Sequence, residues 1–354
     1  MPSSNEDGAA AAAEQLGSVS LGVSAERKDN ETENNEDSDK SGTPTKLCSA
    51  CDKESDALMK CRACKCVWYC DKKCQNKHWK EHKIECKRIK SILDQRGGKS
   101  DVGTEKEVGP LGKVPPQEEC PICMHALPLH GSLHRYSSCC GKTICCGCSF
   151  QHQMKSTERV ITCAFCRTAL PDSDEEILAR RRKRVELKDP QALRAMAMHY
   201  GKGELGLRMD QTKCIELMRQ SADLGCPAAQ YNLGCYYHFG EMGLEQNVEE
   251  ALKYFTEAAE DGDLVARHNL GCVEEESGDH VAAMRHWRQS ASGGFKKSME
   301  NLIVFFEHGD LRHGDLAEIL QVFYRARAEM KSDDRDKHIK HLKEAGEYRA
   351  EYDL

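Results

Sequence analysis

The stretch "AAQYNLGCYYHFGEMGLEQNVEEALKYFTEAAEDG", residues 228–262, decides the fold of the C-terminal half of this chain. An earlier copy lies 37 residues back, and the first half of a later copy lies 37 residues on. Small residues recur at equivalent positions, which lets paired antiparallel helices approach closely. These positions are Ala192, Ala229 and Ala266, then Gly234 and Gly271, then Cys235 and Cys272. The pattern predicts a solenoid of helix pairs.

The turns of the repeat carry capping signals. Asp210, Asn247 and Asp279 stand at equivalent places and suit the N-cap of each second helix. A fourth, degraded copy begins near Ser298. Each unit ends on a glycine that suits a helix C-cap, namely Gly225, Gly262 and Gly294.

The consensus A-x3-LG-x2-Y…G-x2-G…A-x6-AA-x2-G resembles Sel-one-like repeats, which are relatives of the tetratricopeptide class. The resemblance implies an all-α solenoid over residues 189–330 that binds partner proteins on its concave surface. Residues 331–354 are expected to form a helix that caps the array. Residues 172–188 are expected to form a connecting helix, because acidic residues begin this segment and basic residues end it.

Nine cysteines lie upstream, in "CPICMHALPLHGSLHRYSSCCGKTICCGCSFQHQMKSTERVITCAFC", residues 120–166. Three Cys-x2-Cys pairs at these intervals resemble a RING finger, which we place at residues 119–171 and name the RING-like finger. Because RING zinc sites are cross-braced, the resemblance implies a complete first site. Its ligands would be Cys120, Cys123, Cys145 and Cys148.

The second site of this finger would take Cys163 and Cys166 plus two further ligands. A RING finger has a histidine where this chain has Lys142, whose ammonium group has no lone pair for a metal. We favour Cys139 and Cys140, as in the eight-cysteine RING variants. Two alternatives stay open: Cys140 with a histidine, or an empty or degenerate site. The competing histidines are His134 and His152.

The RING resemblance implies ubiquitin-ligase chemistry, in which the finger holds a ubiquitin-conjugating enzyme without a nucleophile of its own. Ile122 matches the apolar docking position, and Arg167 matches the arginine that bridges the conjugating enzyme and ubiquitin. Ala164 departs from the usual proline of the last knuckle, although Phe165 could keep this patch apolar. The alternative is that Ile122 and Arg167 are only local packing and surface residues.

Eight further cysteines lie in "CSACDKESDALMKCRACKCVWYCDKKCQNKHWKEHKIEC", residues 48–86. The stretch resembles a MYND-type zinc finger, which we place at residues 47–90 and name the MYND-type finger. Cys66 is left over and is not expected to be a ligand. The resemblance implies two interleaved zinc sites: Cys48, Cys51, Cys70 and Cys74 in one, and Cys61, Cys64, His82 and Cys86 in the other.

MYND-type fingers bind proteins, often through proline-rich peptides, and the peptide-contact positions of the family match Gln75 and Trp79. Trp79 could instead pack within the small core. Such fingers also occur in SET-domain methyltransferases, but we identify no SET motifs downstream and do not expect that activity. A segment of about 40 residues cannot bury enough surface to fold alone, so metal binding would supply its folding energy.

The rest of the chain sets the context for these modules. Residues 1–46 hold ten acidic and four basic side chains and are expected to form a disordered tail, and residues 91–118 a flexible linker. The whole chain of 354 residues has a formal net charge of -7, most of it in that tail. Nucleic acid is therefore not an expected partner, and no membrane segment or signal peptide is recognised.

These observations predict a multidomain chain: two small zinc-stabilised α+β modules followed by an all-α helical-repeat solenoid. Four zinc ions are expected, two in each finger. The expected location is the cytoplasm, the nucleus or both, where clustered cysteines stay reduced and bind metal. The function expected is that of a RING-type ubiquitin ligase whose MYND-type finger and repeats recruit substrate. The alternative is a non-enzymatic scaffold built from the same interaction modules.

Overall fold

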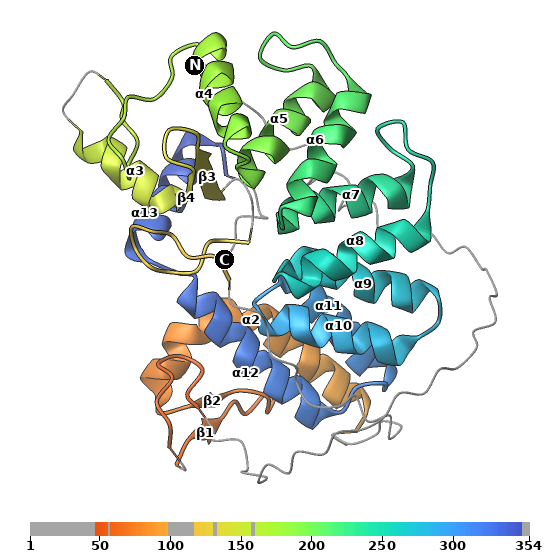
Figure 1. The fold of residues 1–354 in the computed structure, drawn as a ribbon. Coiled ribbons are helices and arrows are strands. Elements are labelled where there is room, and N and C mark those ends of the chain that lie inside the picture. Colours follow the sequence, from red (N-terminus) through yellow and green to blue (C-terminus); the bar gives the residue numbers. More distant parts are fainter. Residues whose placement is uncertain (1–46, 56, 98–116, 130–132, 157–159, 349–354) are drawn as a thin grey trace, which may run out of the picture. The chain divides into compact units, whose positions relative to one another are not determined.

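The computed structural model describes residues 47–55, 57–97, 117–129, 133–156 and 160–348. The tail expected at residues 1–46 and most of the linker expected at residues 91–118 lie outside these described residues. Two small antiparallel sheets and a series of helices make up the described chain (Figure 1). None of the described helices combines the length and apolar character needed to cross a membrane.

The sheets have two strands each, and the helices carry the labels of Figure 1. The strands are β1 (Met59–Lys60), β2 (Trp68–Tyr69), β3 (His134–Ser137) and β4 (Lys142–Cys145). The helices before the repeats are α2 (Lys72–Gln95), α3 (Cys146–Lys155) and α4 (Asp174–Glu186). Those from the repeats onward are α5 (Pro190–Lys202), α6 (Gln211–Asp223), α7 (Pro227–Phe239), α8 (Val248–Glu260), α9 (Leu264–Glu276), α10 (His280–Ser292), α11 (Lys296–His308), α12 (His313–Glu329) and α13 (Asp333–Ala345).

The chain divides into two compact units, and their boundaries differ from the domains predicted from the sequence. The first unit contains the RING-like finger with α4 to α8, part of α9, and α13; the second contains the MYND-type finger with α10, α11 and most of α12. Each finger therefore folds together with helices that the sequence analysis assigned to the repeat array. Helix α2 also continues to Gln95, past the boundary expected at residue 90.

The helices of the first unit form the solenoid that the repeat pattern predicted. Helix α5 packs against α6, α6 against α7, and α7 against α8 (Figure 1). The side chains of Asp210 and Asn247 cap α6 and α8 by accepting backbone N–H bonds, as expected. Gly203 and Gly240 end α5 and α7 in the left-handed conformation, which glycine adopts without strain.

The repeated spacing of small residues in this chain has a direct steric cause. A Cβ atom added to Gly234 would lie 2.6 Å from the ring of Phe255, within the first unit. In the second unit, a Cβ atom at the equivalent Gly271 would lie 2.5 Å from the indole nitrogen of Trp287. In both helix pairs, the glycine thus makes room for a buried aromatic ring of the following helix.

The MYND-type finger shares one apolar core with the helices of the second unit. Tyr69 and Ile89 of the finger are fully buried in the same cluster as Trp287, Phe306 and Phe323. Arg96, the C-cap residue of α2, also bonds to α11, because its guanidinium group donates to the carbonyl oxygen of Phe306. The MYND-type finger is therefore not an independently packed domain, because its core is continuous with that of the helices of the second unit.

The RING-like finger contacts α4 through residues of the basic run that follows it. Arg180 donates to the carbonyl oxygen of Ala169 at 2.6 Å, and Arg184 donates to that of Ser138 at 3.2 Å. These bonds give two of the arginines a structural role in holding the finger.

Helix α13 differs from its expected role as a cap of the repeats. It packs against α3 of the RING-like finger, within the first unit (Figure 1). The side chain of Phe150 lies between His338 and His341, with ring centroids 5.1 and 5.0 Å away. The physical reason is that α13 has only one buried side chain, Arg335, and this side chain bonds to the finger.

Candidate metal centres

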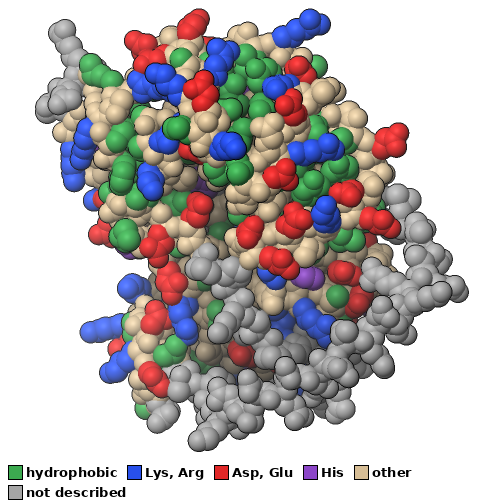
Figure 2. Space-filling view, in the orientation of Figure 1, with side chains coloured by type: hydrophobic (Ala, Val, Ile, Leu, Met, Phe, Trp, Pro, Cys, Tyr) green, Lys and Arg blue, Asp and Glu red, His purple; other side chains and the backbone are tan. Residues whose placement is uncertain are grey.

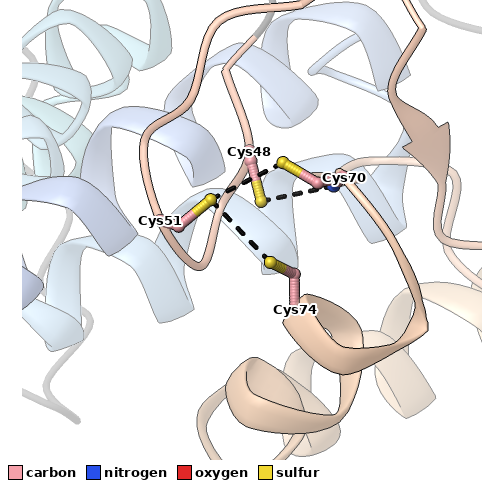
Figure 3. Close-up of side chains that lie close together, drawn as sticks. All are labelled: Cys48, Cys51, Cys70 and Cys74. Carbon is pink, nitrogen blue, oxygen red and sulfur yellow. Dashed lines mark hydrogen bonds between the residues drawn. The ribbon is translucent and has the colours of Figure 1, made fainter.

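The first candidate metal centre lies in the MYND-type finger and is partly exposed to solvent. Cys51 Sγ lies 3.6 Å from Cys70 Sγ and 3.8 Å from Cys74 Sγ, and all four sulfur atoms point toward a common centre (Figure 3). Tetrahedral zinc with Zn–S bonds of about 2.3 Å holds its sulfur ligands about 3.8 Å apart. Asp71 caps α2 by accepting from Cys74 N–H, and this cap fixes the last ligand. The set is Cys48, Cys51, Cys70 and Cys74.

The second centre of this finger is fully buried. Cys61 Sγ lies 3.6 Å from Cys86 Sγ, and Cys64 Sγ lies 3.2 Å from Nε2 of His82. His82 and Cys86 stand one turn apart on α2, so the helix presents both toward the same point. The set is Cys61, Cys64, His82 and Cys86.

Two side chains of α12, those of His313 and Tyr324, contact residues of this buried centre. The Tyr324 hydroxyl lies 3.2 Å from Nδ1 of His82 and donates to Glu85 Oε2 at 3.3 Å. Nε2 of His313 lies 2.8 Å from the carbonyl oxygen of Cys64 and 3.2 Å from Cys66 Sγ. Cys66 therefore faces His313 and lies outside the ligand cluster, and Tyr324 is placed to fix the ring orientation of His82.

The two remaining centres lie in the RING-like finger. In the first, Cys123 Sγ lies 3.9 Å from Cys145 Sγ. In the second, Cys140 Sγ lies 4.0 Å from Cys163 Sγ, and Cys139 Sγ lies 3.3 Å from Cys166 Sγ. The full sets are Cys120, Cys123, Cys145 and Cys148, and Cys139, Cys140, Cys163 and Cys166.

His134 and His152, the alternative ligands of the second RING-like site, contact other groups instead. Nδ1 of His134 lies 3.2 Å from the carbonyl oxygen of Pro128, and Nε2 of His152 lies 2.9 Å from Thr162 Oγ1. Lys142, which occupies the usual histidine position, is exposed. The structure thus brings the neighbouring thiols of Cys139 and Cys140 together with the last knuckle, and neither histidine joins them.

Four Cys-x2-Cys pairs share one backbone turn, although they belong to two different fingers. The residue after the second cysteine adopts a left-handed conformation, with φ between 54° and 64°. Its N–H bonds to the carbonyl oxygen of the first cysteine at 2.9–3.0 Å. The four turn residues are Asp52, Lys65, Met124 and Arg167. The RING-like pairs therefore have the same knuckle geometry as the MYND-type pairs.

The thiols in these clusters are close enough to share protons. A hydrogen bond from Cys145 lowers the pKa of Cys120 to about 4, whereas the same contact raises the pKa of Cys145. Hydrogen bonds from Cys64 and Cys86 likewise lower the pKa of Cys61. Zinc takes deprotonated thiolates, so a bound ion would replace the shared protons.

The donor set fits zinc in all four clusters. Fifteen sulfur atoms and one imidazole nitrogen supply the ligands, and within each cluster the ligand atoms lie within 4.8 Å of one another. Thiolate and imidazole in groups of four are typical of structural zinc, and no position is left for a reactive water. The protein thus has four zinc sites, two in each finger, as expected.

The residues expected to bind partners lie at the surface of their fingers. Trp79 is 39% exposed and Gln75 is half-buried, both on α2. Ile122 is 41% exposed in the first RING-like knuckle, and Arg167 is exposed directly after the last one. On the face shown in Figure 2, acidic and basic side chains are interspersed.

Three residues that were not predicted from the sequence contact ligand residues or their knuckles: Tyr324, His313 and Arg335. Each lies more than 200 residues from the cysteine or histidine that it contacts. A single sequence has no spacing pattern that joins positions so far apart.

Comparison with known families identifies two kinds of module. Residues 48–86 match the MYND finger model, and residues 190–226 and 227–263 match the Sel1 repeat model. The chain contains a MYND finger and Sel1 repeats. Both are protein-interaction modules, so this is a zinc-binding protein-interaction protein. The clusters within residues 120–166 are consistent with RING-like zinc sites.

The curated relatives share only a short segment with this chain. SET domain and MYND-type zinc finger protein 6 of Schizosaccharomyces pombe is 43% identical over 47 residues, which is 13% of this chain and 10% of that protein. Histone-lysine N-methyltransferase SMYD3 of Homo sapiens is 44% identical over 45 residues, 13% and 10% of the two chains. The chain thus spans about a tenth of the length of these relatives.

Solved Sel1-type structures are similar to parts of the chain. A Sel1 repeat protein from Oxalobacter formigenes is 26% identical, with a TM-score of 0.33, and the match covers 36% of this chain and 97% of that one. A protective antigen of uropathogenic Escherichia coli with an SLR fold is 21% identical, with a TM-score of 0.38, covering 58% and 42%. The solenoid itself is defined by the packed helix pairs described above.

Proposed function

We propose that this protein is a RING-type ubiquitin ligase that recruits its substrate through the MYND finger and the Sel1 repeats. The observation that carries the proposal is the surface of the RING-like finger. The first and the last of its three Cys-x2-Cys pairs each present an exposed apolar side chain, and an exposed arginine follows the last cysteine. Such a surface suits a finger that docks one protein and contacts a second.

The apolar part of this surface consists of large side chains that solvent reaches. Ile122 is 41% exposed, Met124 is 67% exposed, and Phe165 of the last knuckle is 43% exposed. Exposed apolar side chains gathered on a small module are typical of a protein-binding patch. Phe165 keeps the last knuckle apolar despite Ala164, the departure from the common RING pattern.

The polar part is Arg167, whose position is set by the zinc knuckle. Its left-handed backbone, with φ of 64°, and its N–H bond to Cys163 tie the residue to the metal site. Its guanidinium group lies 2.5 Å from Nδ1 of His152. The remaining N–H groups of this planar fork can donate hydrogen bonds to two different protein partners.

Substrate recruitment falls to the other modules. Trp79 and Gln75 on α2 offer an aromatic edge and an amide, which suits a proline-rich peptide in an extended conformation. The repeats would bind a second region of the same substrate. Two weak contacts on one chain raise the effective concentration of substrate near the finger.

The alternative function is a non-enzymatic scaffold that uses the same surfaces only for binding. An assay of ubiquitin-chain formation distinguishes the ligase from the scaffold. Wild-type protein is incubated with ubiquitin, an activating enzyme, ATP and each member of a panel of conjugating enzymes, and chain formation is measured. Ile122→Ala and Arg167→Ala are expected to reduce chain formation at least about tenfold, the loss of roughly 1.4 kcal/mol of docking or orientation energy.

A matched control keeps this experiment specific. Met209 is 60% exposed but lies in the repeats, so Met209→Ala is expected to leave chain formation unchanged. Each variant is first shown by native mass spectrometry to hold as many zinc ions as wild type. If wild type forms chains with no conjugating enzyme, or if both finger variants match Met209→Ala, the scaffold is the correct function.

A further inference from the structure

Arg335 is a fully buried cation in the first unit, at the start of α13. Its Nη1 donates to the carbonyl oxygen of Ala126 at 2.8 Å and to that of Met330. Its Nη2 lies 3.5 Å from the carbonyl oxygen of His125 and 3.8 Å from Cys123 Sγ. The guanidinium group thus joins α13 to the knuckle that carries the first two ligands of the RING-like finger.

The charge of Arg335 has no carboxylate partner among the residues that the structure describes. A buried guanidinium ion is costly unless an opposite charge lies near it. The nearest source of negative charge is the thiolate cluster, since four thiolates around one divalent ion leave a net negative charge.

The backbone around Arg335 is fitted closely to α3. A Cβ atom added to Gly147 would lie 2.7 Å from the backbone nitrogen of Arg335 and 2.8 Å from the carbonyl carbon of Asp334. Gly147 lies between Cys145 and Cys148, two ligands of the same site. The absence of a side chain at this position therefore lets α13 reach the metal centre.

We propose that Arg335 is a positioning residue for the first zinc site of the RING-like finger, and that α13 is a structural part of this finger. Its guanidinium group offsets the negative charge of the Cys120–Cys123–Cys145–Cys148 cluster and fixes the carbonyl groups of the first knuckle. The role rests on zinc in this cluster and is independent of ligase activity. A finger truncated after residue 171 would lack this cation.

The test measures zinc release and cysteine protection in the full-length zinc-loaded protein. A chelator is added, and N-ethylmaleimide labels each thiol as zinc leaves it. Peptide mass spectrometry then measures the labelling rate of every cysteine. In Arg335→Met, the thiols of Cys120, Cys123, Cys145 and Cys148 are expected to be labelled about 10–100 times faster. The two clusters of the MYND finger are expected to keep their wild-type rates.

Three further variants separate charge from packing. Arg335→Lys keeps the positive charge and is expected to restore much of the protection. Gly147→Ala, which pushes α13 away, is expected to speed labelling of the same four thiols. Lys340→Met, on the exposed side of α13 at 77% side-chain exposure, is the control and is expected to match wild type.

A spectroscopic measurement covers the case in which Arg335→Met unfolds the chain. Cadmium-113 replaces zinc in wild type and in Arg335→Lys, and the resonances of the cadmium sites are compared. A positioning role predicts that one four-thiolate resonance shifts while the others stay. The proposal is overturned if no resonance shifts in Arg335→Lys, or if a folded Arg335→Met protects the four thiols as well as wild type does.

Discussion

The hydroxyl group of Tyr324 lies 3.2 Å from Nδ1 of His82, although 242 residues separate the two in the chain. The other ring nitrogen of His82 faces the thiolates of the buried MYND site. Burial raises the pKa of Tyr324 well above its usual value, so the hydroxyl keeps its proton and acts as a neutral partner. Helix α12 thus supplies an outer-shell residue to a zinc site in a distant segment.

The substitution Tyr324→Phe removes this partner while keeping the ring. We expect the affinity of the buried MYND site for zinc to fall about tenfold or more, because an outer-shell bond orients the ligating imidazole. Chelator competition monitored by native mass spectrometry measures the loss. Tyr254→Phe, which changes a half-buried tyrosine of α8, is the control. Equal zinc retention in Tyr324→Phe and wild type would rule out this role.

Substitutions of single cysteines test the ligands of the second RING-like site. Cys140 lies in the cluster, whereas Cys146 lies outside all four clusters. Cys140→Ser is expected to lower the zinc content from four ions to three, because a neutral hydroxyl is a poor substitute for a thiolate. Cys146→Ser is expected to keep four. Loss of zinc in His152→Ala but not in Cys139→Ser would show that the histidine alternative is correct, because that alternative keeps Cys140 and replaces Cys139.

The sequence could predict the ligand clusters because their information is local. A Cys-x2-Cys pair or a histidine followed by a cysteine one turn later fixes two ligands by backbone geometry alone. The caps at Asp210 and Asn247 were predictable for the same reason, since the capping side chain bonds three residues ahead. Local spacing, however, does not reveal what each finger packs against.

The packing of α13 against the RING-like finger could not be predicted from the sequence. Its segment, "DDRDKHIKHLKEA", has no apolar stripe, and its place at the end of the repeats predicted only a helix that caps the array. Its attachment depends on one buried arginine and on Phe150 between two histidines. Such polar, long-range contacts leave no periodic signal, whereas the apolar repeat of the solenoid does.

The glycines that face aromatic rings are expected to be sensitive to a single added carbon. Gly234→Ala forces a Cβ atom against the buried ring of Phe255, and Gly271→Ala does the same against Trp287. We expect each to lower the free energy of unfolding by about 1–3 kcal/mol, as overpacked cores do. Chemical denaturation followed by circular dichroism measures this.

Gly314 provides the matched control for these two substitutions. It lies in α12 with nothing within 4 Å of an added Cβ atom. Gly314→Ala is expected to leave stability unchanged or to raise it by up to about 1 kcal/mol, because alanine favours the helix. A loss of stability in Gly314→Ala as large as in Gly234→Ala would contradict the steric explanation.

Removal of zinc should separate the parts of the fold that depend on metal from those that do not. The buried core of the RING-like finger consists largely of its cysteine ligands, together with a few aliphatic side chains such as Leu127, Leu133 and Ile144. The helices α5 to α8 instead bury an apolar core of their own, including Leu193, Met218 and Leu233. We therefore expect a chelator to unfold the fingers and leave α5 to α8 folded.

Hydrogen exchange measured peptide by peptide tests this expectation. After metal removal, amides within residues 117–171 should exchange faster by orders of magnitude, and those of α13 should follow because its partner α3 is lost. Amides of α6 and α7 should keep their protection, since each is packed between neighbouring helices. Uniform loss of protection across α5 to α8 would show instead that the repeats need the zinc modules in order to fold.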